Sequence, residues 1–134
     1  MKVIVAGPRN FNDQKVVFDA IDSFKEQGDQ CVITEIVSGC ANGVDTLGIL
    51  WAKKHGVKVK QFPAQWNNLK VKNCKIKEHK FGQGNYNVLA GLNRNIEMAK
   101  YADALIAIDT GSSGTKHMIS TARKQGLLLY VVKI

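Results

Sequence analysis

The sequence lacks any apolar run long enough to span a membrane. No segment approaches the roughly 18 uninterrupted apolar residues of a membrane helix, and the opening residues, MKVIVAG, are too short for the core of a signal peptide. The cysteines, Cys31, Cys40 and Cys74, form no Cys-x-x-Cys pair, which favours free thiols over a disulfide framework or a zinc site. These absences predict a cytoplasmic protein with no metal and no contact with a membrane.

Two common nucleotide-binding motifs are also missing. GPRNFN, residues 7–12, lacks the second and third glycines of the dinucleotide fingerprint, and the Gly-Lys-Ser/Thr of a P-loop does not occur. Ordinary dehydrogenases and nucleoside triphosphatases are therefore disfavoured, and we expect no cofactor.

The composition that is present is typical of one globular domain. The 134 residues are 45% hydrophobic and 22% charged, which suits a single core over residues 1–134. The net charge of +8 favours anionic partners. Charge alone does not distinguish a nucleotide from a nucleic-acid strand or a solvated surface.

The chain alternates between short apolar runs and segments of helical period. Apolar runs rich in β-branched residues lie at 3–6, 31–37, 57–62, 104–108 and 127–132, and four helical stripes lie between them, the third formed by Leu89, Leu92, Ile96 and Ala99. Gly28, Gly56 and Gly126 are placed to end three helices in a left-handed conformation. The pattern predicts an α/β, Rossmann-like single domain with a five-stranded parallel sheet and helices on both faces. Such sheets bind ligands at the carboxyl ends of their strands.

A long basic segment, residues 63–87, interrupts this alternation. It carries Lys70, Lys72, Lys75, Lys77 and Lys80. Long loops in compact domains tend to be functional. We consider a solvated surface, a lid over an anionic ligand, a nucleic-acid contact, and a small exposed hairpin within KVKNCKIK, residues 70–77.

Three of the predicted strands end in glycine-bearing turns that precede helices. These turns are AGPRNFN at 6–12, SGCANGVDT at 38–46 and DTGSSGTKH at 109–117. Unpaired N–H groups at a helix N-terminus hold phosphate or carboxylate, and glycine lets the backbone approach closely. A phosphate-bearing ligand is therefore predicted.

Five ordered motifs together resemble the cpYpsA-related SLOG family. They are GPRNF, SGCANGVDT, FPAQW, GLNRNIEMAKYADALIA and GSSGTKHMI, and they span almost the whole chain. The family lies in a superfamily with the cytokinin-activating LOG enzymes and the DNA-processing protein DprA. The resemblance implies a Rossmann-like fold, a nucleotide or nucleotide-derived ligand at the glycine-bearing strand ends, and homo-oligomerisation as an option.

The turns and the family motifs together define the candidate ligand-binding residues. Arg9 and Arg94 suit phosphate, and Asp45 suits sugar hydroxyls. Trp66 is either a core anchor or a surface on which a base stacks. His117 is interpreted as structural rather than catalytic. The full set of candidates is Gly7, Pro8, Arg9, Ser38, Gly39, Asn42, Gly43, Asp45, Trp66, Arg94, Asn95, Gly111, Ser112, Ser113, Gly114 and Thr115.

The sequence departs from the related patterns at several positions, among them Val44, where the family's second turn usually has alanine. Cys40 stands where the family's second turn usually has glycine, and Met118 stands where the LOG enzymes have a glutamate. Because methionine cannot exchange a proton, LOG-type hydrolysis is disfavoured, and Asp45 and Glu97 remain as candidate catalytic acids.

The resulting functional prediction is binding of a nucleotide or nucleotide-derived small molecule. A more specific hypothesis is that the protein senses or sequesters a signalling nucleotide in the conflict between bacteria and phages. Two alternatives remain open: a phosphoribohydrolase-like enzyme that cleaves a nucleotide N-glycosidic bond, and a DprA-like protein that binds single-stranded nucleic acid.

Overall fold

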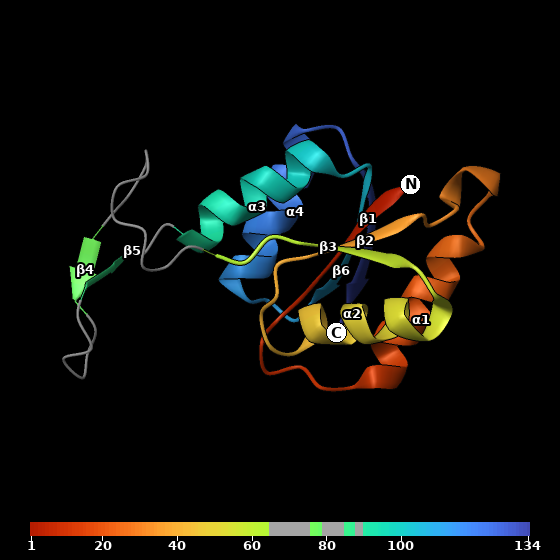
Figure 1. The fold of residues 1–134 in the computed structure, drawn as a ribbon, viewed down its shortest axis with the longest axis horizontal. Coiled ribbons are helices and arrows are strands. Elements are labelled where there is room, and N and C mark those ends of the chain that lie inside the picture. Colours follow the sequence, from red (N-terminus) through yellow and green to blue (C-terminus); the bar gives the residue numbers. More distant parts are fainter. Residues whose placement is uncertain (65–75, 79–84, 88–89) are drawn as a thin grey trace.

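The computed structural model describes residues 1–64, 76–78, 85–87 and 90–134. Strands and helices alternate through most of this region (Figure 1). In chain order the elements are β1 (Lys2–Ala6), α1 (Gln14–Lys25), the 3-10 helix η1 (Asp29–Cys31), β2 (Glu35–Ser38), α2 (Val44–His55), β3 (Lys58–Gln61), β4 (Ile76–Glu78), β5 (Asn85–Asn87), α3 (Ala90–Tyr101), β6 (Ala104–Asp109), α4 (Ser113–Lys124) and β7 (Leu128–Lys133).

Five of the strands form one parallel sheet in the order β3-β2-β1-β6-β7. This confirms the predicted Rossmann-like α/β fold. The chain runs outward from β1 to β3 and then returns to β6 on the other side of β1. The direction of winding therefore reverses between β1 and β6, and in open α/β sheets a crevice for ligands forms at this place.

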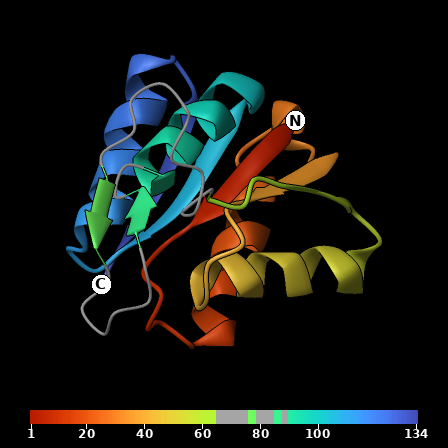
Figure 2. The same ribbon diagram turned by 60° about the vertical axis from the view of Figure 1, so that its left-hand side comes forward.

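Helices cover both faces of the sheet (Figures 1 and 2). Val3 and Val5 of β1 point to the layer of α1 and α2, where Phe24 and Trp51 are buried. Ile4 of β1 points to the layer of α3 and α4. Because each central strand is buried on both sides, its sequence is a continuous apolar run rather than an alternating one.

The predicted strand over 31–37 was wrong at its start. Cys31 belongs to η1, and β2 begins only at Glu35. The N–H and the hydroxyl of Thr34 both donate to the carbonyl of Met1, directly before β1. The chain therefore passes the start of β1 before it joins the sheet as β2. Cys31 and Ile33 are buried as packing residues, and this explains why they looked like part of a strand.

The inward face of α3 also differs from the predicted stripe. Asn95 and Met98 are buried with Ala99, whereas Leu92 is 37% exposed. Asn95 is turned toward α4, where its side chain contacts His117. The inward face of α3 therefore combines apolar packing with a polar contact to α4.

Two of the glycines that were predicted to end helices differ in conformation. Gly56 ends α2 in the left-handed conformation, with φ of 65° and ψ of 29°, as predicted. Gly28 has φ of 154° and ψ of 172°, so the left-handed prediction was wrong there.

Only part of the basic segment 63–87 is described. β4 and β5 pair antiparallel, with Lys77 opposite Tyr86. Several residues with predicted roles lie outside the described residues: Trp66, Lys70, Lys72, Cys74, Lys75 and Lys80. Their predicted roles stay predictions. Among the described helices, none is long and apolar enough to cross a membrane.

Candidate functional site

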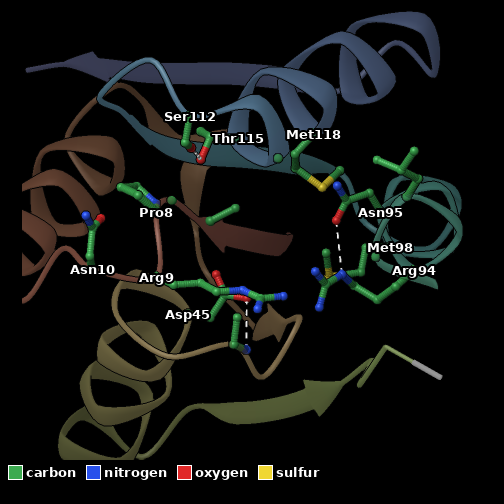
Figure 3. Close-up of a pocket in the computed structure, with 16 residues that line it drawn as sticks. Pro8, Arg9, Asn10, Asp45, Arg94, Asn95, Met98, Ser112, Thr115 and Met118 are labelled. Carbon is green, nitrogen blue, oxygen red and sulfur yellow. Dashed lines mark hydrogen bonds between the residues drawn. The ribbon is translucent and has the colours of Figure 1, made fainter. Parts of the chain in front are cut away.

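A cavity of about 420 Å³ lies at the carboxyl ends of β1 and β6. The turn after β1, the start of α2, one side of α3 and the start of α4 contribute its walls (Figure 3). The lining residues are Ala6, Gly7, Pro8, Arg9, Asn10, Ala41, Asp45, Gly91, Leu92, Arg94, Asn95, Met98, Ser112, Gly114, Thr115 and Met118.

The turns after β1 and β2 contact each other backbone to backbone. The carbonyl of Pro8 accepts the N–H groups of Phe11 and Val44, at 3.4 and 3.5 Å. Gly43 has φ of 76°, and a Cβ there would lie 2.5 Å from the Pro8 oxygen. A Cβ on Gly7 would lie 2.6 Å from a methyl carbon of Val44. These two glycines therefore allow the turns to approach closely enough to form one wall.

Asp45 is the carboxylate of this site, and it is almost fully buried. One of its oxygens, Oδ2, accepts the N–H of Ala41 at 3.3 Å (Figure 3). Burial raises the pKa of Asp45 to about 6, while the charges of Arg94 and Arg9 and the Ala41 N–H act in the opposite direction. At pH 7 the side chain is mainly ionised and can accept hydrogen bonds from hydroxyl groups.

Arg94 reaches across the cavity from α3 to the turn after β2. Its Nη1 donates to the carbonyl of Gly39 at 2.5 Å, and its Nε donates to Oδ1 of Asn95 at 3.0 Å. Burial lowers the pKa of Arg94, and the nearby Asp45 opposes this effect. Figure 3 shows the exposed side chain of Arg9 extending toward Arg94. The cavity thus has two cationic groups and one carboxylate at the same end.

The start of α4 forms the opposite wall. Ser112 occupies the N-cap position, but its side chain does not cap the helix; its Oγ donates instead to Oγ1 of Thr115 at 2.7 Å. The backbone N–H groups of the first turn can therefore bind an anion. Thr115 is buried and lines the cavity together with Gly114.

The structure brings most of the candidate residues together. Gly7, Pro8, Arg9, Asp45, Arg94, Asn95, Ser112, Gly114 and Thr115 line the cavity. Gly39 and Asn42 line an adjoining cavity of about 310 Å³, which Arg9 and Arg94 also border. Ser38 and Gly43 are buried behind the wall, and Gly111 and Ser113 lie in the α4 turn without lining either cavity.

The two candidate acids are placed differently. Asp45 lines the cavity, whereas Glu97 is exposed on α3 and lines neither described cavity. Among the described lining residues, Asp45 is the only carboxylate. Met118 lines the cavity as a buried thioether.

Sequence reasoning missed several lining residues in the turn after β1 and on α3. Asn10 belongs to the first turn, and Gly91, Leu92 and Met98 lie on the same side of α3 as Arg94. The helical spacing from Gly91 to Arg94, Asn95 and Met98 is the signal that could have identified them.

Cys40 has an unusual backbone conformation, with φ of 63°. Its N–H donates to Oγ of Ser38 at 3.1 Å. Burial, with a smaller effect from Asp45, raises the pKa of its thiol, which therefore stays protonated at neutral pH. Within the described part of the chain, no group of three His, Cys, Asp or Glu side chains could hold a metal ion.

The fold and the cavity define a Rossmann-like α/β domain with a pocket where the winding of the sheet reverses. Residues 1–68, half of the chain, match the model of the family YAcAr, described as the "YspA, cpYpsA-related SLOG family". The chain belongs to this family. The match confirms the resemblance seen in the sequence motifs.

The fold is also similar to a solved structure, the X-ray structure of DNA processing protein A (DprA) from Streptococcus pneumoniae. The TM-score is 0.68 at 20% sequence identity, and the alignment covers 97% of this chain and 49% of the other. The chain therefore spans about half the length of that protein, and the similarity concerns the fold. Comparison with curated protein sequences gave no match.

Proposed function

We propose that the protein binds a nucleotide or nucleotide-derived small molecule in the 420 Å³ cavity. The observation that carries this proposal is the combination of Arg9, Arg94 and the uncapped start of α4 around one cavity at the reversal point of the sheet. Guanidinium groups and helix N-termini both favour phosphate oxygens.

The remaining walls suit the other parts of a nucleotide. The carboxylate of Asp45 is placed to accept hydrogen bonds from ribose hydroxyls. Leu92, Met98 and Met118 offer apolar and thioether contacts for the face of a base. The cavity thus has separate regions for charge, for hydroxyl groups and for an apolar ring.

Binding without turnover is the form of this function that we favour. Met118 has no proton to exchange, and Glu97 is exposed away from the lining. These features support a protein that senses or sequesters a signalling nucleotide rather than one that consumes it.

Thermal unfolding with a panel of nucleotides tests the proposal. A ligand that binds only the folded protein at 100 times its Kd stabilises it by about 2.7 kcal/mol, so the Tm rises by several degrees. The panel contains nucleoside monophosphates, cyclic nucleotides and ADP-ribose-type compounds. Arg94→Ala should abolish most of the shift, whereas the matched control Arg123→Ala, an exposed arginine in the last turn of α4, should keep it. No shift with any compound would contradict the proposal.

Binding of single-stranded nucleic acid is the second candidate. The net charge of +8 and the similarity of the fold to DprA support it. If the basic segment 63–87 follows a nucleic-acid backbone, affinity should fall steeply with salt, and replacing its five lysines should flatten that dependence. Tight, length-dependent binding at physiological salt would favour this candidate over the small-molecule one.

A further inference from the structure

Four side chains form a hydrogen-bonded chain that leads from the cavity into α4. Arg94 Nε contacts Asn95 Oδ1 at 3.0 Å, and Asn95 Nδ2 contacts His117 Nδ1 at 3.2 Å. The other ring nitrogen of His117, Nε2, lies 3.5 Å from Oγ1 of Thr121. His117 is half-buried and does not line the cavity. It is connected to the cavity through the hydrogen bonds of Asn95 and Arg94.

The donor and the acceptor of each hydrogen bond in this series of four side chains can be assigned by starting from Arg94. A guanidinium has only donors, so Asn95 must present its oxygen to Arg94 and its NH₂ group to His117. The NH₂ group donates, and therefore Nδ1 of His117 must accept. An imidazole that accepts at Nδ1 is the neutral tautomer with its proton on Nε2, and that proton points at Thr121.

The surroundings of His117 favour the same neutral state. Burial, with a smaller effect from the positive charge of Lys124, lowers the pKa of His117. Arg94, which faces it from α3 through Asn95, is also cationic. The strands beneath this helix layer contribute apolar side chains, including Leu105 and Ala107. A protonated imidazole would place an N–H against the NH₂ group of Asn95.

We propose that Asn95 and His117 are positioning residues that hold the guanidinium of Arg94 in place for an anionic ligand; this inference rests on the proposed function. A long arginine side chain loses conformational entropy when it is fixed. Arg94 is held at two points, through Nη1 by the Gly39 carbonyl and through Nε by Asn95. Its remaining N–H groups are thereby presented in advance, and ligand binding need not supply this ordering.

Removing the acceptor on His117 should loosen this arrangement. In His117→Phe, the NH₂ group of Asn95 loses its acceptor, and the amide can rotate away from Arg94. His117→Asn is the conservative rescue, because the side-chain oxygen of asparagine can occupy the place of Nδ1. We expect the affinity for adenosine monophosphate to fall about tenfold in His117→Phe, a change of about 1.4 kcal/mol, and to be largely restored in His117→Asn.

Nuclear magnetic resonance of the ligand-free protein tests the arrangement independently of any ligand. With ¹⁵N-labelled histidine, His117 should show an unprotonated Nδ1 and a protonated Nε2 at pH 7. The Arg94 Nε–H signal should be protected from exchange with solvent and should lose that protection in His117→Phe. A protonated Nδ1, or an Arg94 signal unchanged in folded His117→Phe, would overturn the inference.

Asn95→Asp gives a second test should His117→Phe fail to fold. The aspartate still accepts from Arg94 but can no longer donate to His117, so the imidazole should take up a proton at Nδ1. An unchanged tautomer would count against the inference.

If the wild-type tautomer is as expected but adenosine monophosphate and the other nucleotides do not bind, the proposed function fails while the arrangement stands. If the nucleotide binds equally to wild type and His117→Phe, the positioning role is wrong while the proposed function stands.

Discussion

The guanidinium of Arg94 lies against the α-carbon of Gly39. Nη1 of Arg94 donates to the Gly39 carbonyl, and a Cβ on Gly39 would lie 2.5 Å from that nitrogen and 2.8 Å from Oδ2 of Asp45. A residue with a side chain at this position would meet both charged groups. The absence of a side chain therefore allows Arg94 and Asp45 to approach the same turn.

Gly39→Ala should displace Arg94 and weaken ligand binding. Inserting a methyl group into a filled space costs about 1–3 kcal/mol, and here the flexible arginine is the group that can move. We expect the nucleotide-induced rise in Tm to be smaller than in wild type. The Tm of the ligand-free protein should fall by less than this reduction. Arg123→Ala is the control, because Arg123 is exposed in the last turn of α4 and lines neither described cavity. A full nucleotide-induced shift in Gly39→Ala would contradict this account of the turn.

Stability should depend on pH through Asp45. Burial raises the pKa of Asp45 from 3.8 to about 6, so the folded protein binds this proton more tightly than the unfolded chain does. The stabilisation is complete below about pH 4 and is lost as the pH rises through about 6; it amounts to about 3 kcal/mol. The free energy of unfolding of wild type, minus that of Asp45→Asn, should therefore fall between pH 4 and pH 7. Urea denaturation of both proteins over this range measures it, and a constant difference would show that Asp45 keeps its ordinary pKa.

Nucleoside monophosphates should survive incubation with the protein. Cleavage of the N-glycosidic bond needs a group that assists the leaving base or activates water, and Met118 does neither. Chromatography after long incubation should show no free base. Release of base over many turnovers, abolished by Asp45→Asn, would instead identify an enzyme that uses the buried carboxylate. A gain of activity in Met118→Glu would show that the rest of the catalytic site is present.

Replacement of Cys40 should reveal the cost of its backbone conformation. A residue with a side chain at φ of 63° is disfavoured by about 1–2 kcal/mol relative to glycine. Cys40→Gly removes this penalty from the folded protein, but part of the resulting stabilisation is offset because glycine makes the unfolded chain more flexible. We expect Cys40→Gly to be up to about 1 kcal/mol more stable and the β-branched Cys40→Val to be less stable than wild type in urea denaturation. Equal stability of the glycine and valine variants would exclude a strained backbone at this residue.

The sequence patterns predicted the parallel sheet because strands buried on both faces leave continuous apolar runs. They failed at Cys31 and Ile33, which are equally apolar and buried but precede the strand. They also failed on α3, because the polar Asn95 is buried through a contact with His117, 22 residues away. Contacts of this kind leave no local signal.

The candidate site was predicted for a different reason. The glycine-bearing turns, each directly after a predicted parallel strand, indicated that Arg9, Asp45 and Thr115 would meet at one edge of the sheet, and the structure brings them around one cavity. The exposure of Glu97 depends on how α3 is rotated about its axis, and the hydrophobic periodicity did not predict this rotation. Their binding roles remain predictions until a ligand is identified.

The cavity lies across the boundary between two segments of the chain. Residues 2–61 contribute β1, β2 and β3, residues 104–133 contribute β6 and β7, and the pairing of β1 with β6 joins the two groups of strands. Arg9 and Asp45 lie on the first side of this boundary, and Thr115 lies in α4, which packs on β6 and β7 of the second side. Arg94 lies in α3, which packs against α4 and β1. A molecule held by both sides would act as a reversible cross-link, which must dissociate before the two groups of strands can separate. Ligand occupancy should therefore slow amide hydrogen exchange most strongly along β1 and β6, even though the ligand contacts only the carboxyl ends of these strands.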